Sequence, residues 1–240
     1  MRISPPDAYW KKDVVLFFGK RFALAIKMLY PLAIIGPVAA SEIPAQYAAA
    51  VIGIVAVMAG TFGAGESLTS DLNDGILVRV SLTPLSPYRI VFEVLAVNVL
   101  LDFLQLLPAL FVVFLLHPVP LVWIFAACVA LFATLVAANC IGIFIANFTS
   151  SPADVLLYAT AILFPLIYVS GFFRNQNPDG ILLALRSFVP FAYANDALKT
   201  VFGLTTSTAP LEAIVYPVVI CGVMALGVCF TAPHLLRTRF

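Results

Sequence analysis

The chain has 240 residues, of which 62% are hydrophobic and 10% are charged, and its formal net charge is +1. Long apolar runs, each near the ~20 residues that cross a bilayer, predict an integral membrane protein and exclude a water-soluble domain. The near-neutral charge balance also excludes a basic surface for nucleic acid.

Residues 8–21 predict an amphipathic helix that lies in the plane of the lipid headgroups. Trp10 and Phe17 fall on one side of this helix at helical spacing, whereas Lys12 and Asp13 fall on the other. Basic side chains of such helices reach toward lipid phosphates. The alternative is that this segment is simply the start of a long first span.

The rest of the chain predicts an all-α membrane fold with two hairpins and two long connections. A tight loop at residues 41–45 and the pair His117-Pro118 make the hairpins, while residues 66–88 and 173–211 make the long connections. We expect a single transmembrane domain over residues 1–240, with six spans at about 22–40, 46–65, 89–116, 119–146, 154–172 and 212–232.

The distribution of lysine and arginine predicts the orientation. If the N-terminus is cytoplasmic, ten of these residues lie on the cytoplasmic side and three on the outer side. We therefore expect a multi-pass protein of the cell membrane with both termini in the cytoplasm. The ten are Arg2, Lys11, Lys12, Lys20, Arg21, Lys27, Arg79, Arg89, Arg237 and Arg239; the three are Arg174, Arg186 and Lys199.

The outer connection contains two short amphipathic stretches, residues 179–188 and 192–202, which Pro190 separates. Each is too short to cross a bilayer, and backbone at membrane depth must be helical or protected inside protein. These limits predict a re-entrant helical hairpin or two helices that cap the outer mouth. A folded surface loop is less consistent with the apolar content.

Several enzyme motifs fail on inspection. The segment GTFGAGES, residues 60–67, has the glycine spacing of a nucleotide-binding loop, but Glu66 stands where the phosphate-binding lysine belongs. The segment DGILVR, residues 74–79, resembles the start of a lipid phosphatidyltransferase motif but lacks its later metal-binding aspartates. The histidines are isolated, and the cysteines lie in apolar runs without a C-x-x-C pair. We expect no catalytic or metal site.

The polar loop after the second span indicates contact with a partner. Gly75 can end one helical turn and Pro84 can begin another, with Arg79 between them. Ile76 and Leu77 contribute to a short apolar face, as expected of a cytoplasmic helix that docks a soluble protein. The alternative is an ordinary linker.

A polar stripe interrupts the third span. Asn98, Asp102 and Gln105 recur at i, i+4 and i+7 and therefore share one helix face. A charged side chain in mid-span costs at least ~2.5 kcal/mol on insertion scales, so the stripe should face protein or water. Helix packing and a role in the substrate pathway both remain open.

Two segments together resemble a known family. The run GILVRVSLTPLS, residues 75–86, is similar to the G-T-L-E-x-L-x-x-[TS]-P-L-S signature of type-2 ATP-binding-cassette (ABC) exporter permeases. The segment Ser170-Gly171-Phe172, followed by Pro190, Tyr193 and Asp196, resembles the family's outer ending. The predicted spans and entry helix agree over nearly the whole chain.

This resemblance implies a membrane subunit without an ATPase of its own. It would pair with a second permease, the same or different, and with two cytoplasmic ATPase subunits that bind ATP and Mg. It implies a coupling helix at about residues 70–85 and an outer gate at about 173–192. The implied coupling residues are Asp74, Gly75, Leu77, Arg79, Thr83, Pro84, Leu85 and Ser86; those of the gate are Gly171, Phe172, Phe173, Pro190, Tyr193 and Asp196.

The sequence thus predicts the permease of an ATP-driven exporter embedded in membrane lipid. The alternative is a secondary transporter or channel that ATP does not drive. The loop from Gly75 to Ser86 discriminates between them, because such a docking element has no obvious use in a self-sufficient carrier.

Overall fold

A computed structural model describes residues 10–19, 21–41, 45–76, 86–173, 180–202 and 210–237, and within these residues every regular element is a helix. The all-helical membrane class predicted from the sequence is therefore confirmed. The helices are α1 (Trp10–Gly19), α2 (Arg21–Ala40), α3 (Ala45–Asn73), α5 (Pro87–Leu116), α6 (Leu121–Ala146), α7 (Pro152–Val169), α8 (Ile181–Arg186), α9 (Pro190–Val201) and α10 (Pro210–Arg237).

Two helices begin slightly earlier than predicted because each starts with a Ser-Pro pair. The Ser86 hydroxyl accepts a hydrogen bond from the backbone N–H of Arg89 at 3.3 Å, and Ser151 caps α7 in the same way. The following proline occupies the first helical turn, where its missing N–H leaves no bond unmade.

Helix α3 ends later than predicted, at Asn73 rather than near residue 65. Thr69 lies 3.3 Å from Thr149, hydroxyl oxygen to hydroxyl oxygen, and the Asn73 amide donates to the Ser150 carbonyl at 3.0 Å. These contacts hold the last turns of α3 against the residues that follow α6. The first part of the predicted long connection is thus helix.

Within the described parts of the chain, four helical segments are long and apolar enough to cross a membrane. A fifth exists if α1 and residues Leu24–Ala40 of α2, which are inclined by 80°, form one bent span. In α10, Val218–Thr231 forms a shorter apolar helix. The four segments are Tyr47–Asn73, Tyr88–Leu116, Leu121–Ala146 and Pro152–Val169.

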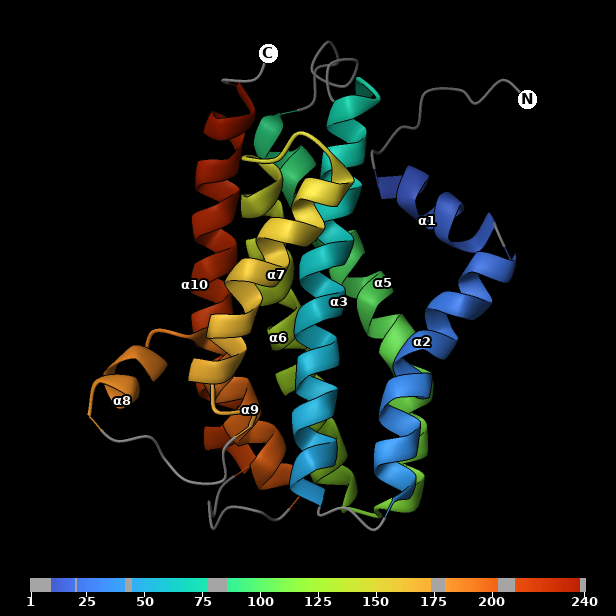
Figure 1. The fold of residues 1–240 in the computed structure, drawn as a ribbon, viewed down its shortest axis with the longest axis vertical. Coiled ribbons are helices and arrows are strands. Elements are labelled where there is room, and N and C mark those ends of the chain that lie inside the picture. The colour runs from blue at the N-terminus through green and yellow to red at the C-terminus, as the bar shows by residue number, and fades with distance from the viewer. Residues whose placement is uncertain are drawn as a thin grey trace.

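Helices α3 and α6 form the centre of the bundle (Figure 1). Helices α9 and α10 pack against α6, whereas α2 and α5 pack against each other on the opposite side of α3. Helices α8 and α9 lie at the end of the bundle away from α1 and from the last turn of α10 (Figure 1). The core is therefore a helix pair with a different set of neighbours on each flank.

The N-terminal helix α1 packs against α5 and α2 at the side of the bundle (Figure 1), and a basic residue of its polar side contacts α3. Lys12 forms an ion pair with Asp71 of α3, and its Nζ lies 3.3 Å from Asp13. Phe17 is buried, whereas Phe18 is exposed. The sequence predicts that the basic side chains of this helix reach toward lipid phosphate, whereas Lys12 pairs with a carboxylate of α3 that the periodicity of α1 alone does not reveal.

Candidate functional site

A polar cavity of about 470 Å³ lies between α1, α2, α3 and α5. Its wall combines ionisable and amide side chains with aromatic rings, which is unusual for a space at membrane depth. The polar lining is Asp13, Lys27, Glu66, Ser67, Asn98, Asp102 and Gln105; the aromatic lining is Phe17, Tyr30 and Phe62.

Asp102 is the most buried acidic group of this lining, with 4% of its surface exposed. It sits near the middle of α5, and its Oδ2 accepts a hydrogen bond of 2.9 Å from the Asn139 amide of α6. The carboxylate lies close against α3 at Gly63, where an added Cβ would stand 3.1 Å from Oδ1. A glycine at this point makes room for the carboxylate.

The other two residues of the predicted stripe reach the same cavity. Asn98 is 8% exposed, and its amide donates to the Val94 carbonyl of its own helix at 2.9 Å. Gln105 is partly buried and also lines the cavity. The structure therefore brings Asn98, Asp102 and Gln105 to one polar space and keeps them from lipid.

The charges around the cavity are unequal. Three carboxyl groups, of Asp13, Glu66 and Asp102, share the lining with one ammonium group, that of Lys27. Lys27 interacts electrostatically with all three carboxyl groups, and its Nζ lies 5.4 Å from the centroid of the Phe17 ring. Lys27 is itself exposed, so the cavity has carboxyl groups in its interior and an ammonium group at its rim.

The opposite face of α3 packs closely on α6 through glycines. An added Cβ at Gly142 would lie 2.3 Å from the carbonyl oxygen of Thr61, and one at Gly60 would lie 2.8 Å from Cβ of Ala138. Small residues of this kind let helix backbones approach in membranes. Gly60 and Gly65 therefore allow close packing of α3 on α6, whereas Gly63 between them faces Asp102.

Comparison with known proteins identifies the family. A family model described as "ABC-2 type transporter" matches residues 8–202, which run from before α1 to just past the end of α9. The chain belongs to this family. A search of curated proteins finds no match. The resemblance to type-2 ABC permeases is thus confirmed, and membership implies association with an ABC ATPase subunit.

Only part of the permease's predicted coupling segment falls within the described residues. Asp74 and Gly75 form the turn after α3, and Gly75 has φ of +65°, the left-handed conformation that glycine adopts without strain. Ser86 caps α5. Residues 70–73 belong to α3 and not to a separate helix. The remaining predicted coupling residues, Leu77, Arg79, Thr83, Pro84 and Leu85, lie outside the described residues.

Most of the predicted gate residues of the permease gather where α7 ends and α9 begins. Gly171 has φ of +79°, and its carbonyl accepts a hydrogen bond of 3.0 Å from Lys199. The ring of Phe172 is buried against Gly53 of α3, where an added Cβ would lie 2.2 Å from the ring. Phe173, by contrast, is largely exposed and makes no comparable packing contact.

Helix α9 carries the other three gate residues. Pro190 occupies the first turn of α9, so it starts this helix where the sequence suggested a break between two helices. Tyr193 donates to the Ser187 carbonyl at 3.0 Å, and Asp196 pairs with Arg186 of α8. Burial raises the pKa of Asp196 above its ordinary value, and the Arg186 guanidinium opposes that shift.

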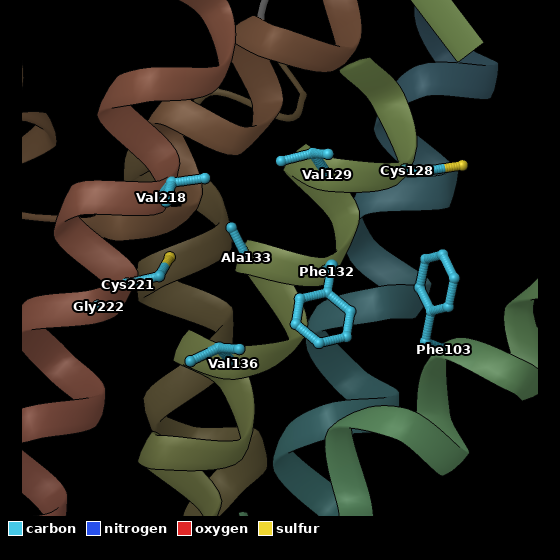
Figure 2. A pocket seen from close by; sticks show the side chains of 9 residues that line it. All are labelled: Phe103, Cys128, Val129, Phe132, Ala133, Val136, Val218, Cys221 and Gly222. Atoms are coloured by element: carbon cyan, nitrogen blue, oxygen red, sulfur yellow. The ribbon is translucent and has the colours of Figure 1, made fainter. Parts of the chain in front are cut away.

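A second cavity differs in character. It measures about 510 Å³ and lies between α5, α6 and α10, and its lining includes Phe103, Phe132, Val218 and Cys221 (Figure 2). The Phe103 and Phe132 rings meet edge to face at 5.8 Å. Among the described residues, no side chain with a carboxyl, amine or amide group lines this cavity. The chemistry of the permease is therefore concentrated in the polar cavity.

Of the polar site's lining, sequence reasoning predicted only Asn98, Asp102 and Gln105. Lys27 and Glu66 carry charge within or beside predicted spans, a signal that could have marked them. The prediction places Glu66 in a connection because it ends the second span at residue 65, whereas α3 continues to Asn73. Tyr30 and Asn139 gave weaker signals, since a tyrosine or an asparagine in an apolar run also serves ordinary packing.

Proposed function

We propose that the chain is the membrane-spanning subunit of an ATP-driven exporter. The observation that carries this proposal is the match of residues 8–202 to the ABC-2 family. A cavity with a buried carboxyl group in mid-helix, which fits a polar route through an otherwise apolar bundle, supports it.

The complete transporter would contain two permease chains, identical or different, and two cytoplasmic ATPase subunits. ATP and Mg bind to the ATPase subunits, and this chain hydrolyses no nucleotide itself. The packing of Gly60, Gly65 and Gly142 in a helix interface supports this division of labour, because the glycine-rich segment is committed to structure.

In the proposed topology the chain crosses the cell membrane six times with both termini in the cytoplasm. Helices α2 and α10 complete the set of spans, and α1 lies at the interface. The excess of lysine and arginine on the side of residues 74–86 supports this orientation.

The segment from Asp74 to Ser86 would receive the ATPase, and the outer region of residues 173–211 would act as a re-entrant gate. The coupling segment joins the end of α3 to the start of α5. Helix α3 carries Glu66 and helix α5 carries Asp102, and both residues line the polar cavity. A rotation of this segment would therefore change the polar cavity through two rigid helices.

Co-expression with a cognate ATPase tests the proposal. The purified chain alone should hydrolyse no ATP, whereas the pair should purify as one complex with ATPase activity that substrate stimulates. Arg79→Glu and Gly75→Val should weaken docking or uncouple hydrolysis from transport, because they alter the charge and the left-handed turn of the coupling segment. Arg237→Glu, a charge reversal on the same proposed side, serves as the control. ATPase activity from the chain alone would contradict the proposal.

Labelling of single cysteines tests the topology. Cysteines introduced at Asn175 or Thr206 should react with an impermeant thiol reagent from outside the cell, and one at Ser150 should not. The opposite pattern would reverse the orientation while leaving the family assignment intact.

A further inference from the structure

The carboxyl groups of the polar cavity are only partly matched by hydrogen-bond donors among the described residues. Oδ2 of Asp13 has no hydrogen-bond partner, although the side chain is only 10% exposed and its Oδ1 lies 3.3 Å from Nζ of Lys12. Asp102 receives one bond, from Asn139 to Oδ2, and its Oδ1 faces the cavity beside Gly63. A carboxylate removed from water is costly unless a cation or a donor compensates for it. The lining of the cavity thus holds three carboxyl groups and one ammonium group, and Lys12 lies against one of the three carboxyl groups from outside the lining.

The arrangement of the carboxyl groups does not suit a metal ion. Among the described residues, no three His, Cys, Asp or Glu side chains are close enough together to hold one. Calcium requires six to eight oxygen ligands in one shell, and magnesium requires an octahedral shell. Carboxyl groups spread around a space of about 470 Å³ are better matched to a larger cation of low charge density.

Aromatic rings in the wall complete the chemistry for an organic ammonium ion. Phe17, Tyr30 and Phe62 line the cavity together with the three carboxyl groups. Ring faces attract ammonium groups within about 6 Å of the centroid. Lys27 already shows this contact, with its Nζ 5.4 Å from the centroid of Phe17.

We propose that the polar cavity binds an organic ammonium ion with an apolar substituent, and that the Lys27 side chain is a tethered competitor for the same position. The Lys27 ammonium lines the cavity 5.4 Å from the centroid of the Phe17 ring, and its charge acts on each of the three carboxyl groups, so an incoming ammonium group would compete with it. This inference takes the cavity as the substrate-recognition site of the proposed permease and thereby rests on that function. The ammonium group belongs either to a soluble amine or to a lipid headgroup.

Equilibrium binding to the full-length chain in a neutral maltoside detergent tests the inference. The probes are phenethylammonium, 2-phenylethanol and 3-phenylpropionate, which share an aromatic tail and differ in charge. Phenethylammonium should bind most tightly. Lys27→Met should raise its affinity, and Asp102→Asn should lower it, each on the order of tenfold, or about 1.4 kcal/mol.

Matched variants separate recognition from folding. Lys11→Met and Asp154→Asn make the same changes outside the cavity and should leave binding unchanged. If Asp102→Asn does not yield monodisperse protein, Glu66→Gln replaces it and should lower the affinity in the same direction. The inference would be overturned if phenethylammonium and 2-phenylethanol bound equally well. It would also be overturned if neither Lys27→Met nor the substitution of the carboxyl group changed the affinity for phenethylammonium.

A competition arm identifies the source of the ammonium group. If short-chain phosphatidylethanolamine displaces phenethylammonium and short-chain phosphatidylglycerol does not, the ammonium group belongs to a lipid headgroup. If neither lipid displaces phenethylammonium, the ammonium group belongs to a soluble amine. Both results support the cation site. Because the assay contains no ATPase and no ATP, its failure is distinguishable from failure of the proposed coupling function.

Discussion

The two faces of α3 meet very different neighbours. Toward α6, Gly60 and Gly65 allow backbone contact so close that no Cβ fits at Gly60. Toward α5, Gly63 opens onto a polar cavity with the carboxylate of Asp102 opposite. The three glycines lie within six residues of one another, yet two serve a dry interface and one serves a polar space.

This difference shows how a small membrane protein can separate rigidity from chemistry. Close packing of α3 on α6 involves no charged group and depends on shape. The cavity on the other face is bounded by α1 and α2, which meet at 80° and contribute exposed side chains such as Lys27. Helix α3 therefore packs on α6 with one face and lines the polar cavity with the other.

The largest expected effect comes from filling the dry interface. Gly142→Ala places a Cβ 2.3 Å from the Thr61 carbonyl oxygen, and backbone on both sides must move. Overpacking of this kind costs about 3 kcal/mol. We expect a large fall in the thermal midpoint and in the yield of monodisperse protein. Gly227→Ala, where a Cβ meets open space, is the control, and an equal effect of the two would show that the interface is not rigid.

The next largest effect comes from Asp102, where size and charge can be separated. Asp102→Leu removes an acceptor from Asn139 and should cost about 1–3 kcal/mol. Asp102→Asn retains an acceptor, so assembly should survive while substrate-stimulated ATPase activity of the complex falls. Thermal stability and stimulated ATPase activity are the two measurements. If the Asp102→Asn complex assembled normally and substrate stimulated its ATPase activity normally, Asp102 would serve only helix packing.

A smaller effect is expected at Gly63, on the cavity face of the same helix. Gly63→Ala puts a Cβ 3.1 Å from Oδ1 of Asp102, and the carboxylate can yield by a few tenths of an ångström. Stability should change by less than about 1 kcal/mol, whereas cation affinity should fall. Calorimetry and probe binding measure the two quantities. Destabilisation equal to that of Gly142→Ala would remove the contrast between the two faces.

The smallest effect is expected at the start of α5, beyond the cavity. Arg89 pairs with Glu93 at 2.8 Å across one helical turn, and its side chain is 56% exposed. Exposed pairs at this spacing contribute about 0.3–0.5 kcal/mol. The Glu93 side chain is only 11% exposed, but it also accepts a hydrogen bond from the Trp10 backbone N–H at 3.4 Å, so Arg89→Gln should shift the thermal midpoint only slightly. A shift as large as that of Asp102→Leu would indicate that charge stabilises this side of the bundle more than packing does.

Much of this protein could be predicted from its residues. The apolar runs predicted an all-helical fold, because a segment that must satisfy its own backbone in lipid has few alternatives to a helix. Of the six predicted spans, four or five correspond to described helices that are long and apolar enough to cross a membrane. The spacing of Asn98, Asp102 and Gln105 predicted a shared face turned from lipid, and the motif around Gly75 predicted the family that the comparison confirmed. These features are local, and each is contained within one helix or one loop.

What surrounds that polar face was decided by the tertiary structure alone. Asp13, Lys27 and Glu66 come from three other helices, and Asn139 from a fourth, and no periodicity connects them to Asp102. The same limit explains why Lys12 was expected at lipid headgroups although Asp71 holds it. In a membrane protein the outward faces of all helices are apolar, so hydropathy can show that a side chain turns inward but not which neighbour it meets.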